Sequence, residues 1–281
     1  MRVFSAEVLG TKLSVQVDTR APLGAVFARV LKTARAFERK YSRFAPDNWL
    51  ARLNAAGGGK LDAEAAAMLR CALLLARRTD GVFDPTVGPL LSRLCYGPES
   101  DARDAVPTDW RLVKISRGRV RLDGGVRLEF GGVGKGYLLG KIAKSLGRYR
   151  RFLVDFGGDL YGRGGWDVAL EHPADPACAV GTVRLDGGFL CASSGLRRRF
   201  GNGSHHLVDP KSGASATDVL GAFVESRDGM RADAYATALC VLPFERAALL
   251  LGSGEVEGVI MAADGRVWQS PGSRAKMFWA K

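Results

Sequence analysis

The stretch Arg127–Leu146, RLEFGGVGKGYLLGKIAKSL, joins two kinds of hydrophobic periodicity across a glycine-rich corner. Before the corner, Val126, Leu128 and Phe130 alternate with polar residues, as in a strand with one buried face. After it, apolar residues recur every three or four positions, which predicts a helix over residues 137–147. Unpaired N–H groups and the dipole at such a helix start favour an anion.

The corner matches neither of two common nucleotide fingerprints. Lys135 is followed by Gly136, whereas a Walker A loop has Ser or Thr at that place. The glycines Gly134, Gly136 and Gly140 are spaced G-x-G-x-x-x-G rather than G-x-G-x-x-G. Two interpretations stay open at this point, a phosphate-binding corner and a tight strand–helix turn.

The rest of the chain predicts an α+β fold, because strands come in antiparallel-looking pairs between helices. The apolar spacing predicts helices over residues 22–40, 62–81 and about 231–242, and Asp62 offers an N-cap to the second. Strand pairs are predicted over residues 3–17, 111–130 (with its turn at Asp123–Gly125), 151–172, 181–195 and 255–272. Residues 96–110 are predicted to form a surface loop.

The composition is that of an ordinary globular protein with an excess of positive charge. The 281 residues are 47% apolar and 25% charged, and 41 basic against 29 acidic residues give a formal charge of +12. This charge favours anionic partners, or is simply that of a basic, soluble surface. It is spread along the chain without an RNP-like or helix-turn-helix pattern, so we expect no nucleic-acid partner.

Cysteines and apolar runs restrict the setting of the protein. The five cysteines are odd in number and scattered, without C-x-x-C, which predicts buried, reduced thiols: Cys71, Cys95, Cys178, Cys191 and Cys240. No apolar run approaches the roughly 20 residues of a transmembrane helix. The N-terminus also lacks the apolar block of a signal peptide. We therefore expect the chain as given to be cytoplasmic, and periplasmic if a leader was removed.

Three further segments carry polar groups suited to chemistry. Asp233 and Thr237 lie four residues apart, hence on one helix face, where carboxylate, hydroxyl and carbonyl oxygens suit Mg²⁺. The alternative is an acidic residue near a helix start and an ordinary Thr. His205 and His206 adjoin a turn. A histidine there could act as a general base or phosphate donor, or could be a loop histidine bonded to backbone. Asp84 begins a structured turn after the helix that ends at Gly81.

In order, these segments resemble the ApbE family, the FAD:protein FMN transferases, almost from end to end. The matching elements are LGT (9–11), YSRFAPDNWLARLN (41–54), DGVFDPTVGPL (80–90), EFGGVGKGY (129–137), FLVDFGGDL (152–160), ASSG (192–195), SHHLVDPKSG (204–213) and ADAYATAL (232–239). The resemblance implies the family's α+β, T-fold-like architecture, with antiparallel sheets flanked by helices, as one catalytic domain over residues 1–281.

The resemblance also implies an activity. The FMN moiety of FAD would pass, with Mg²⁺, to a Thr or Ser hydroxyl of an acceptor flavoprotein that carries a D-x-x-[ST]-[GS]-A-[ST] type site, and AMP would be released. Two alternatives stay open: an FAD pyrophosphatase on the same scaffold, in which water replaces the hydroxyl, and a flavin-binding protein without activity.

Residue by residue, the resemblance implies four metal ligands: the side chains of Asp233 and Thr237 and the backbone oxygens of Gly132 and Ala236. His206 matches the family's proposed base, and Asp233 counts as catalytic through the metal. Lys135 is placed near the leaving AMP by its position alone. Positions that match FAD contacts are Leu9, Phe44, Val82, Phe83, Asp84, Glu129 and Val208.

The chain departs from the family's pattern at several of these places. Glu129 stands where the family usually has Asp, and Phe44 where it often has Tyr. Leu196-Arg197 replace a usual Asp-Tyr, and His205 is an additional histidine beside the expected one.

Overall fold

The computed structural model describes residues 1–94, 96, 106–195, 199 and 204–278. Cys95, Leu196-Arg197 and most of the expected surface loop at 96–110 lie outside the described residues. Among the described residues, no helix is both long and apolar enough to cross a bilayer.

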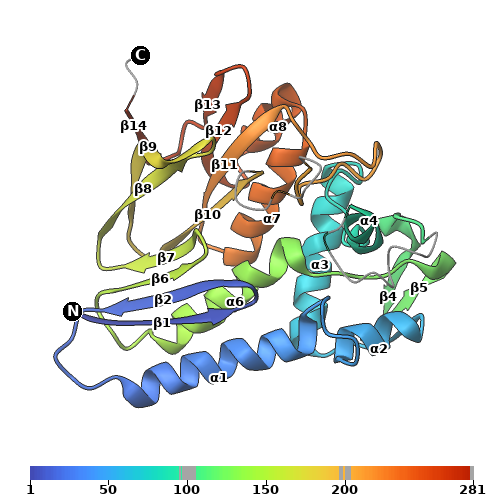
Figure 1. Ribbon diagram of the computed structural model, residues 1–281, viewed down its shortest axis with the longest axis horizontal. Coiled ribbons are helices and arrows are strands. Elements are labelled where there is room, and N and C mark those ends of the chain that lie inside the picture. Colours follow the sequence, from blue (N-terminus) through green and yellow to red (C-terminus); the bar gives the residue numbers. More distant parts are fainter. Residues whose placement is uncertain (95, 97–105, 196–198, 200–203, 279–281) are drawn as a thin grey trace.

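The centre of the fold is an antiparallel sheet in which eight described strands pair with their neighbours. Alternating apolar residues supply β2 and β6, as the sequence predicts, whereas β11 is buried over most of its length. In spatial order they are β1 (Arg2–Val8), β2 (Thr11–Val17), β6 (Phe152–Phe156), β7 (Asp159–Arg163), β10 (Gly188–Ser194), β11 (Val219–Ser226), β12 (Glu257–Ala262) and β13 (Val267–Gln269) (Figure 1). The predicted α+β class is thereby confirmed.

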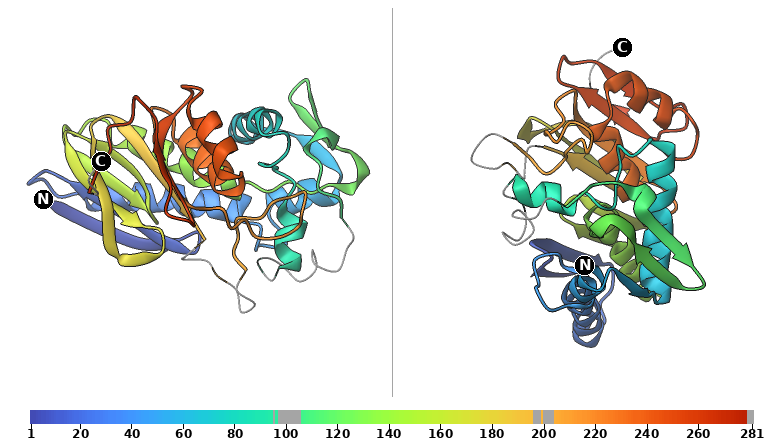
Figure 2. Two further views of the ribbon diagram at one scale, coloured as in Figure 1. Left: turned by 90° about the horizontal axis from the view of Figure 1, so that it is seen from above. Right: turned by 90° about the vertical axis from the view of Figure 1, so that its right-hand side faces the viewer.

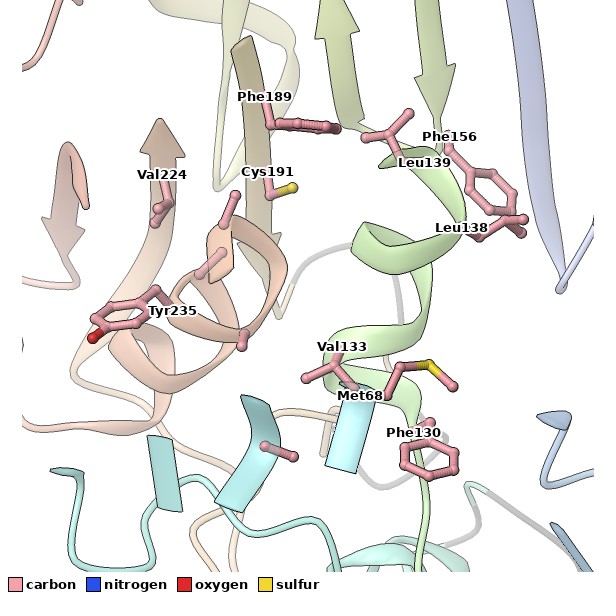
Figure 3. Close-up of a cluster of buried hydrophobic side chains, with 14 of the residues drawn as sticks. Met68, Phe130, Val133, Leu138, Leu139, Phe156, Phe189, Cys191, Val224 and Tyr235 are labelled. Atoms are coloured by element: carbon pink, nitrogen blue, oxygen red, sulfur yellow. The ribbon is translucent and has the colours of Figure 1, made fainter. Parts of the chain in front are cut away.

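Helices cover one face of this sheet, and a small sheet covers part of the other. The helices that contact it are α1 (Gly24–Tyr41), α6 (Gly131–Ser145), α7 (Gly229–Val241) and α8 (Phe244–Leu251), and α3 (Ala63–Arg78) packs against α6 and α7. The small sheet has the order β14 (Lys276–Met277), β9 (Asp175–Leu185) and β8 (Trp166–His172). Strand alternation separates the two cores. Phe189 and Cys191 of β10 face the helices, whereas Leu190 between them packs with the small sheet. Figure 3 shows Phe189 extending toward Leu139 of α6.

A third sheet, β3 (Gly58–Lys60), β5 (Arg119–Leu122) and β4 (Val113–Ser116), lies near α2 (Trp49–Ala55). Figures 1 and 2 place its β4–β5 hairpin at the end of the molecule opposite the N-terminus. The short helix α4 (Gly88–Arg93) and two 3₁₀ turns, Trp110–Leu112 and Asp123–Gly125, complete the described elements.

Several sequence predictions need correction. The β4–β5 hairpin turns at Arg117-Gly118, where φ is positive at both residues, and not at Asp123–Gly125. Residues 151–172 form three strands rather than two, and β11, α2, α4 and α8 were not predicted. The two strands predicted as a pair over residues 181–195 belong to different sheets, β9 to the small sheet and β10 to the main one. The predicted strand at Val126–Phe130 is irregular backbone, and α6 begins at Gly131, so the glycine corner is the first half of a helix. Cys178 is exposed, against the prediction of buried thiols, while Cys191 and Cys240 are buried.

The early glycines of α6 have a packing role, because α6 crosses α7 at close range. A Cβ on Gly136 would overlap the carbonyl oxygen of Gly229 and lie 2.7 Å from Cβ of Asp233. Glycine is a poor helix former, so its use inside α6 indicates that this contact outweighs helix propensity. The crossing brings the glycine segment and the Asp233 segment into one wall.

Candidate active site

A cavity of about 660 Å³ lies beside the α6–α7 crossing, within the range of roughly 300–1,000 Å³ for small-molecule sites. Its walls come from α1, α6, α7, the residues that follow α3, and the His206–Pro210 segment. Of the sequence-predicted site residues, those that line it are Leu9, Phe44, Val82, Phe83, Asp84, Glu129, Gly132, Lys135, His206, Val208, Asp233 and Thr237. Ala236 is fully buried inside α7 and is not part of the lining.

The proposed metal ligands meet where α6 and α7 cross. Asp233 is 2% exposed, and its Oδ2 accepts a hydrogen bond from the Gly136 backbone N–H at 2.8 Å. In an ideal helix that N–H would donate to the carbonyl four residues earlier, which belongs to Gly132. The Asp233 carboxylate therefore competes with the Gly132 carbonyl for the Gly136 N–H. A Cβ on Gly132 would lie 3.7 Å from Cγ2 of Thr237, so three predicted ligands are neighbours.

Lys135 forms a buried ionic cluster with two carboxylates. Its ammonium forms an ion pair with Asp159 and lies 3.3 Å from Oδ1 of Asp233. Burial by itself lowers the pKa of Lys135, but the two carboxylates outweigh it and hold the pKa above its ordinary value. Lys135 is therefore a permanent cation in the cavity wall. Asp159 was not predicted as a site residue, since FGGDL indicated only a glycine turn.

Asp84 holds the loop after α3 in place. Its carboxylate accepts hydrogen bonds from the Thr86 N–H at 2.8 Å, the Thr86 hydroxyl at 2.7 Å and the Trp110 N–H at 3.0 Å. Burial raises its pKa, and these hydrogen bonds offset the shift only in part. The carboxylate thus fixes the wall to which Val82 and Phe83 belong.

Glu129 turns back onto the start of α6. Its Oε2 accepts a hydrogen bond from the Gly131 N–H at 2.7 Å, and burial raises its pKa despite the nearby charge of Arg43. The Gly131 N–H at the helix start, one of the groups predicted to favour a bound anion, therefore already has a carboxylate partner.

The two adjacent histidines have different surroundings. The Nε2–H of His205 donates to the Ala216 carbonyl at 2.8 Å, and burial lowers its pKa, so the backbone-bonded interpretation holds for His205. His206 lines the cavity, and its ring centroid lies 5.9 Å from that of Tyr96. Tyr96 in turn meets Phe44 edge to face at 5.8 Å, which continues the aromatic contacts to the exposed Phe44.

Arg43 and Tyr96 are lining residues that sequence reasoning missed. The Arg43 Nη2 donates to the Gly88 carbonyl at 2.6 Å and to the Ser92 hydroxyl at 2.8 Å, which anchors α4 to the cavity. The YSRF segment carried a signal for Arg43, whereas Tyr96 follows α4 without any motif.

The donor set favours a hard cation held by few protein ligands. Within the described ranges, no group of three or more His, Cys, Asp or Glu side chains is placed to hold a metal. One buried carboxylate, one hydroxyl and a competing carbonyl fit a cation such as Mg²⁺, which usually keeps waters and phosphate oxygens as ligands.

Solved structures share this α+β fold. The ApbE protein of Thermotoga maritima superposes with a TM-score of 0.85 at 22% identity, covering 96% of this chain and 97% of that one. The flavin transferase ApbE of Vibrio cholerae gives 0.84 at 20% identity, with the same coverage. At these identities the likeness establishes the fold.

Sequence comparison identifies the family. The ApbE family model matches residues 9–260, so the chain belongs to the ApbE family. A FAD:protein FMN transferase of Treponema pallidum is 29% identical, covering 94% of this chain and 85% of that protein. One of Klebsiella pneumoniae is 26% identical, covering 96% and 87%. The resemblance found in the motifs is confirmed, and the chain is placed in a family of flavin-transferring enzymes.

Proposed function

We propose that this protein transfers the FMN moiety of FAD to a Thr or Ser hydroxyl of an acceptor flavoprotein, with Mg²⁺ and with release of AMP. The observation that carries the proposal is that two of the predicted metal ligands, Asp233 and Thr237, line one cavity together with Lys135 and His206. We further propose that residues 1–281 act as one catalytic unit.

Asp233 and Thr237 would hold the cation with their side chains, and Gly132 and Ala236 with backbone oxygens. The fit rests on the buried Asp233 carboxylate, the neighbouring Thr237 and the contested Gly132 carbonyl. When bound, Mg²⁺ supplies positive charge that stabilises the transferring phosphoryl oxygens. The Leu9, Val82, Phe83 and Val208 side chains would bind and orient the flavin nucleotide, with Phe44 as a stacking surface.

His206 would accept the proton of the acceptor hydroxyl. The hydroxyl oxygen then forms a bond to the FMN phosphorus, while the anhydride bond to the AMP phosphate breaks and AMP takes the electron pair. The proton on His206 passes to solvent, which regenerates the base. Lys135, a cation in the same wall, would face the negative charge that develops on the leaving AMP.

The decisive experiment incubates the protein with FAD, Mg²⁺ and an acceptor that carries a D-x-x-[ST]-[GS]-A-[ST] type site. AMP release and covalent flavin on the acceptor are then measured together, and we expect equal amounts. AMP and FMN formed without acceptor would instead establish a pyrophosphatase. Tight FAD binding with no AMP at millimolar Mg²⁺ would establish a flavin-binding protein.

His206→Ala is expected to slow transfer by about 10²-fold or more, which is the usual contribution of a general base. FAD affinity should stay within about threefold, because the variant leaves the other walls of the cavity intact. Single-turnover kinetics and equilibrium FAD binding check the two parts. Transfer at the wild-type rate would remove His206 from the role of base.

A further inference from the structure

The buried cluster of Lys135, Asp159 and Asp233 has an uneven charge balance. The side chains of Asp159 and Asp233 are 1% and 3% exposed, and one ammonium serves both carboxylates. The cluster therefore carries one negative charge in excess, in a wall from which water is largely excluded. Buried charges are costly unless they are paired, so this excess invites a further cation.

The two carboxylates have different hydrogen-bond and ion-pair partners. Asp159 has Lys135 as its charged partner and accepts a weak hydrogen bond from the Ala192 N–H at 3.3 Å. Asp233 is held by the Gly136 N–H through Oδ2, and only its Oδ1 faces the Lys135 ammonium at 3.3 Å. The ammonium thus sits closer to Asp159, with Asp233 as its second partner.

A divalent cation and the ammonium compete for the same oxygen. Like charges cannot share Oδ1 of Asp233 at contact distance in a poorly screened site. Lysine has a flexible stem, so its ammonium can move toward Asp159 without a backbone change. Asp159 then keeps the displaced charge paired.

We propose that Lys135 is an internal counter-ion that Asp159 and Asp233 share until a divalent cation binds Asp233, and that Asp159 is the positioning residue that then holds its ammonium alone. The cluster exchanges one cation for another and keeps Asp233 compensated in both states. With the cation bound, Lys135 rests on Asp159 and presents its remaining N–H donors to the cavity. This inference rests on the proposed cation role of Asp233.

The proposal predicts opposite signs for two substitutions in one cluster. Lys135→Met removes the competitor, so Mn²⁺ should bind about tenfold or more tightly, since nearby unit charges interact strongly in a poorly screened site. Asp159→Asn removes the alternative partner and ties the ammonium to Asp233, so Mn²⁺ should bind about tenfold more weakly. The Asn oxygen can still accept the Ala192 N–H. Asp159→Glu should restore most of the affinity.

The test measures Mn²⁺ binding to the full-length, FAD-free protein by electron paramagnetic resonance and calorimetry. Lys141→Met is the matched control, because Lys141 is on the same helix but its ion pair is with Glu64 on the surface. It should leave the Mn²⁺ affinity unchanged. Thermal unfolding supplies a second measurement, in which Lys135→Met is destabilised in EDTA and regains stability with Mn²⁺ to a greater extent than the wild type.

The outcomes separate this inference from the proposed function. Mn²⁺ binding by the wild type that is lost in Asp233→Asn supports the cation role. If Lys135→Met then binds Mn²⁺ equally or less well, or Asp159→Asn binds it equally or better, the counter-ion exchange is wrong and the cation role stands. If the wild type binds no Mn²⁺, or Asp233→Asn binds it as well as the wild type, both are wrong.

Discussion

Two of the lysines of helix α6, six residues apart, have opposite surroundings. Lys135 belongs to a buried cluster with Asp159 and Asp233, whose side chains are at most 3% exposed. Lys141 belongs to a surface cluster, in which it pairs with Glu64, Glu64 faces Lys40 at 3.7 Å, and Lys40 pairs with Asp62. The side chain of Lys141 is 47% exposed and that of Lys135 is 19% exposed.

The difference in burial between the two clusters indicates how much each contributes to stability. Surface ion pairs are screened by water and salt and contribute between about 0 and 1 kcal/mol. A buried pair costs desolvation, yet removing one partner leaves an uncompensated charge that costs about 3–5 kcal/mol. A buried cluster is therefore weak evidence for stability by itself, and its position in the cavity wall agrees with a role in binding.

The largest expected effect compares the two lysines directly. Lys135→Met should lower the free energy of unfolding by about 3–5 kcal/mol in EDTA, since two buried carboxylates lose the cation that they share. Lys141→Met should lower it by no more than about 1 kcal/mol. Urea denaturation of both variants, side by side with the wild type, gives the two values. Equal losses would contradict the division into a buried and a surface cluster.

The sequence predicted the ligand face of α7 but not the buried cluster. Asp233 and Thr237 are four residues apart, so helix geometry alone placed them on one face. Asp159 is 24 residues from Lys135 and pairs with it only because β7 lies beside α6, which is a tertiary fact. No local pattern marks such a partner, and the same holds for Arg43 against α4.

The start of α6 was mispredicted for a related reason. Glycines are poor helix formers, so the sequence indicated a corner before residue 137, whereas the helix begins at Gly131. Packing against α7 requires residues without side chains there, and tertiary contact outweighs local propensity. The hairpins β1–β2, β6–β7 and β12–β13 of the main sheet were predicted because alternation and the turns between adjacent strands are local. The central strand β11 was missed, and so was the pairing of β10 with β7 and β11, which is a tertiary fact.

The second-largest expected effect concerns the close contact between α6, which carries both lysines, and α7. A Cβ on Gly136 would overlap the Gly229 carbonyl oxygen, so Gly136→Ala should cost about 3 kcal/mol, the upper end for overpacking. It should also weaken divalent-cation binding, because α7 and Asp233 must move. Gly140→Ala is the matched control: its Cβ would lie 3.7 Å from Phe189 Cζ, an ordinary contact. The control should be neutral, or stabilising by up to about 1 kcal/mol. A Gly136→Ala variant as stable as Gly140→Ala would show that the crossing does not require a residue without Cβ at position 136.

The smallest expected effect belongs to the surface cluster, where Asp62 both caps α3 and pairs with Lys40. Its carboxylate accepts the Ala65 N–H at 2.9 Å. Burial raises the pKa of Asp62, but the Lys40 ion pair and the Ala65 hydrogen bond outweigh it, so the pKa lies below its usual value. Asp62→Asn keeps the capping oxygen and removes the charge. At pH 7 and low salt it should cost about 0.2–1 kcal/mol, as exposed pairs do.

The pH dependence separates the charge from the cap. A carboxyl whose pKa is lowered on folding stabilises the protein above its unfolded pKa of about 3.9, and this contribution is lost as the pH falls through the folded pKa. The difference between wild type and Asp62→Asn should therefore shrink when unfolding is measured from pH 6 down to pH 3, and also in 1 M salt. Asp62→Ala, which loses the cap as well, should retain a gap of about 1 kcal/mol at every pH, because N-capping by a neutral or charged oxygen needs no ion pair. A pH-independent cost for Asp62→Asn would show that the ion pair contributes nothing, and that the surface cluster differs from the buried one even more than screening alone predicts.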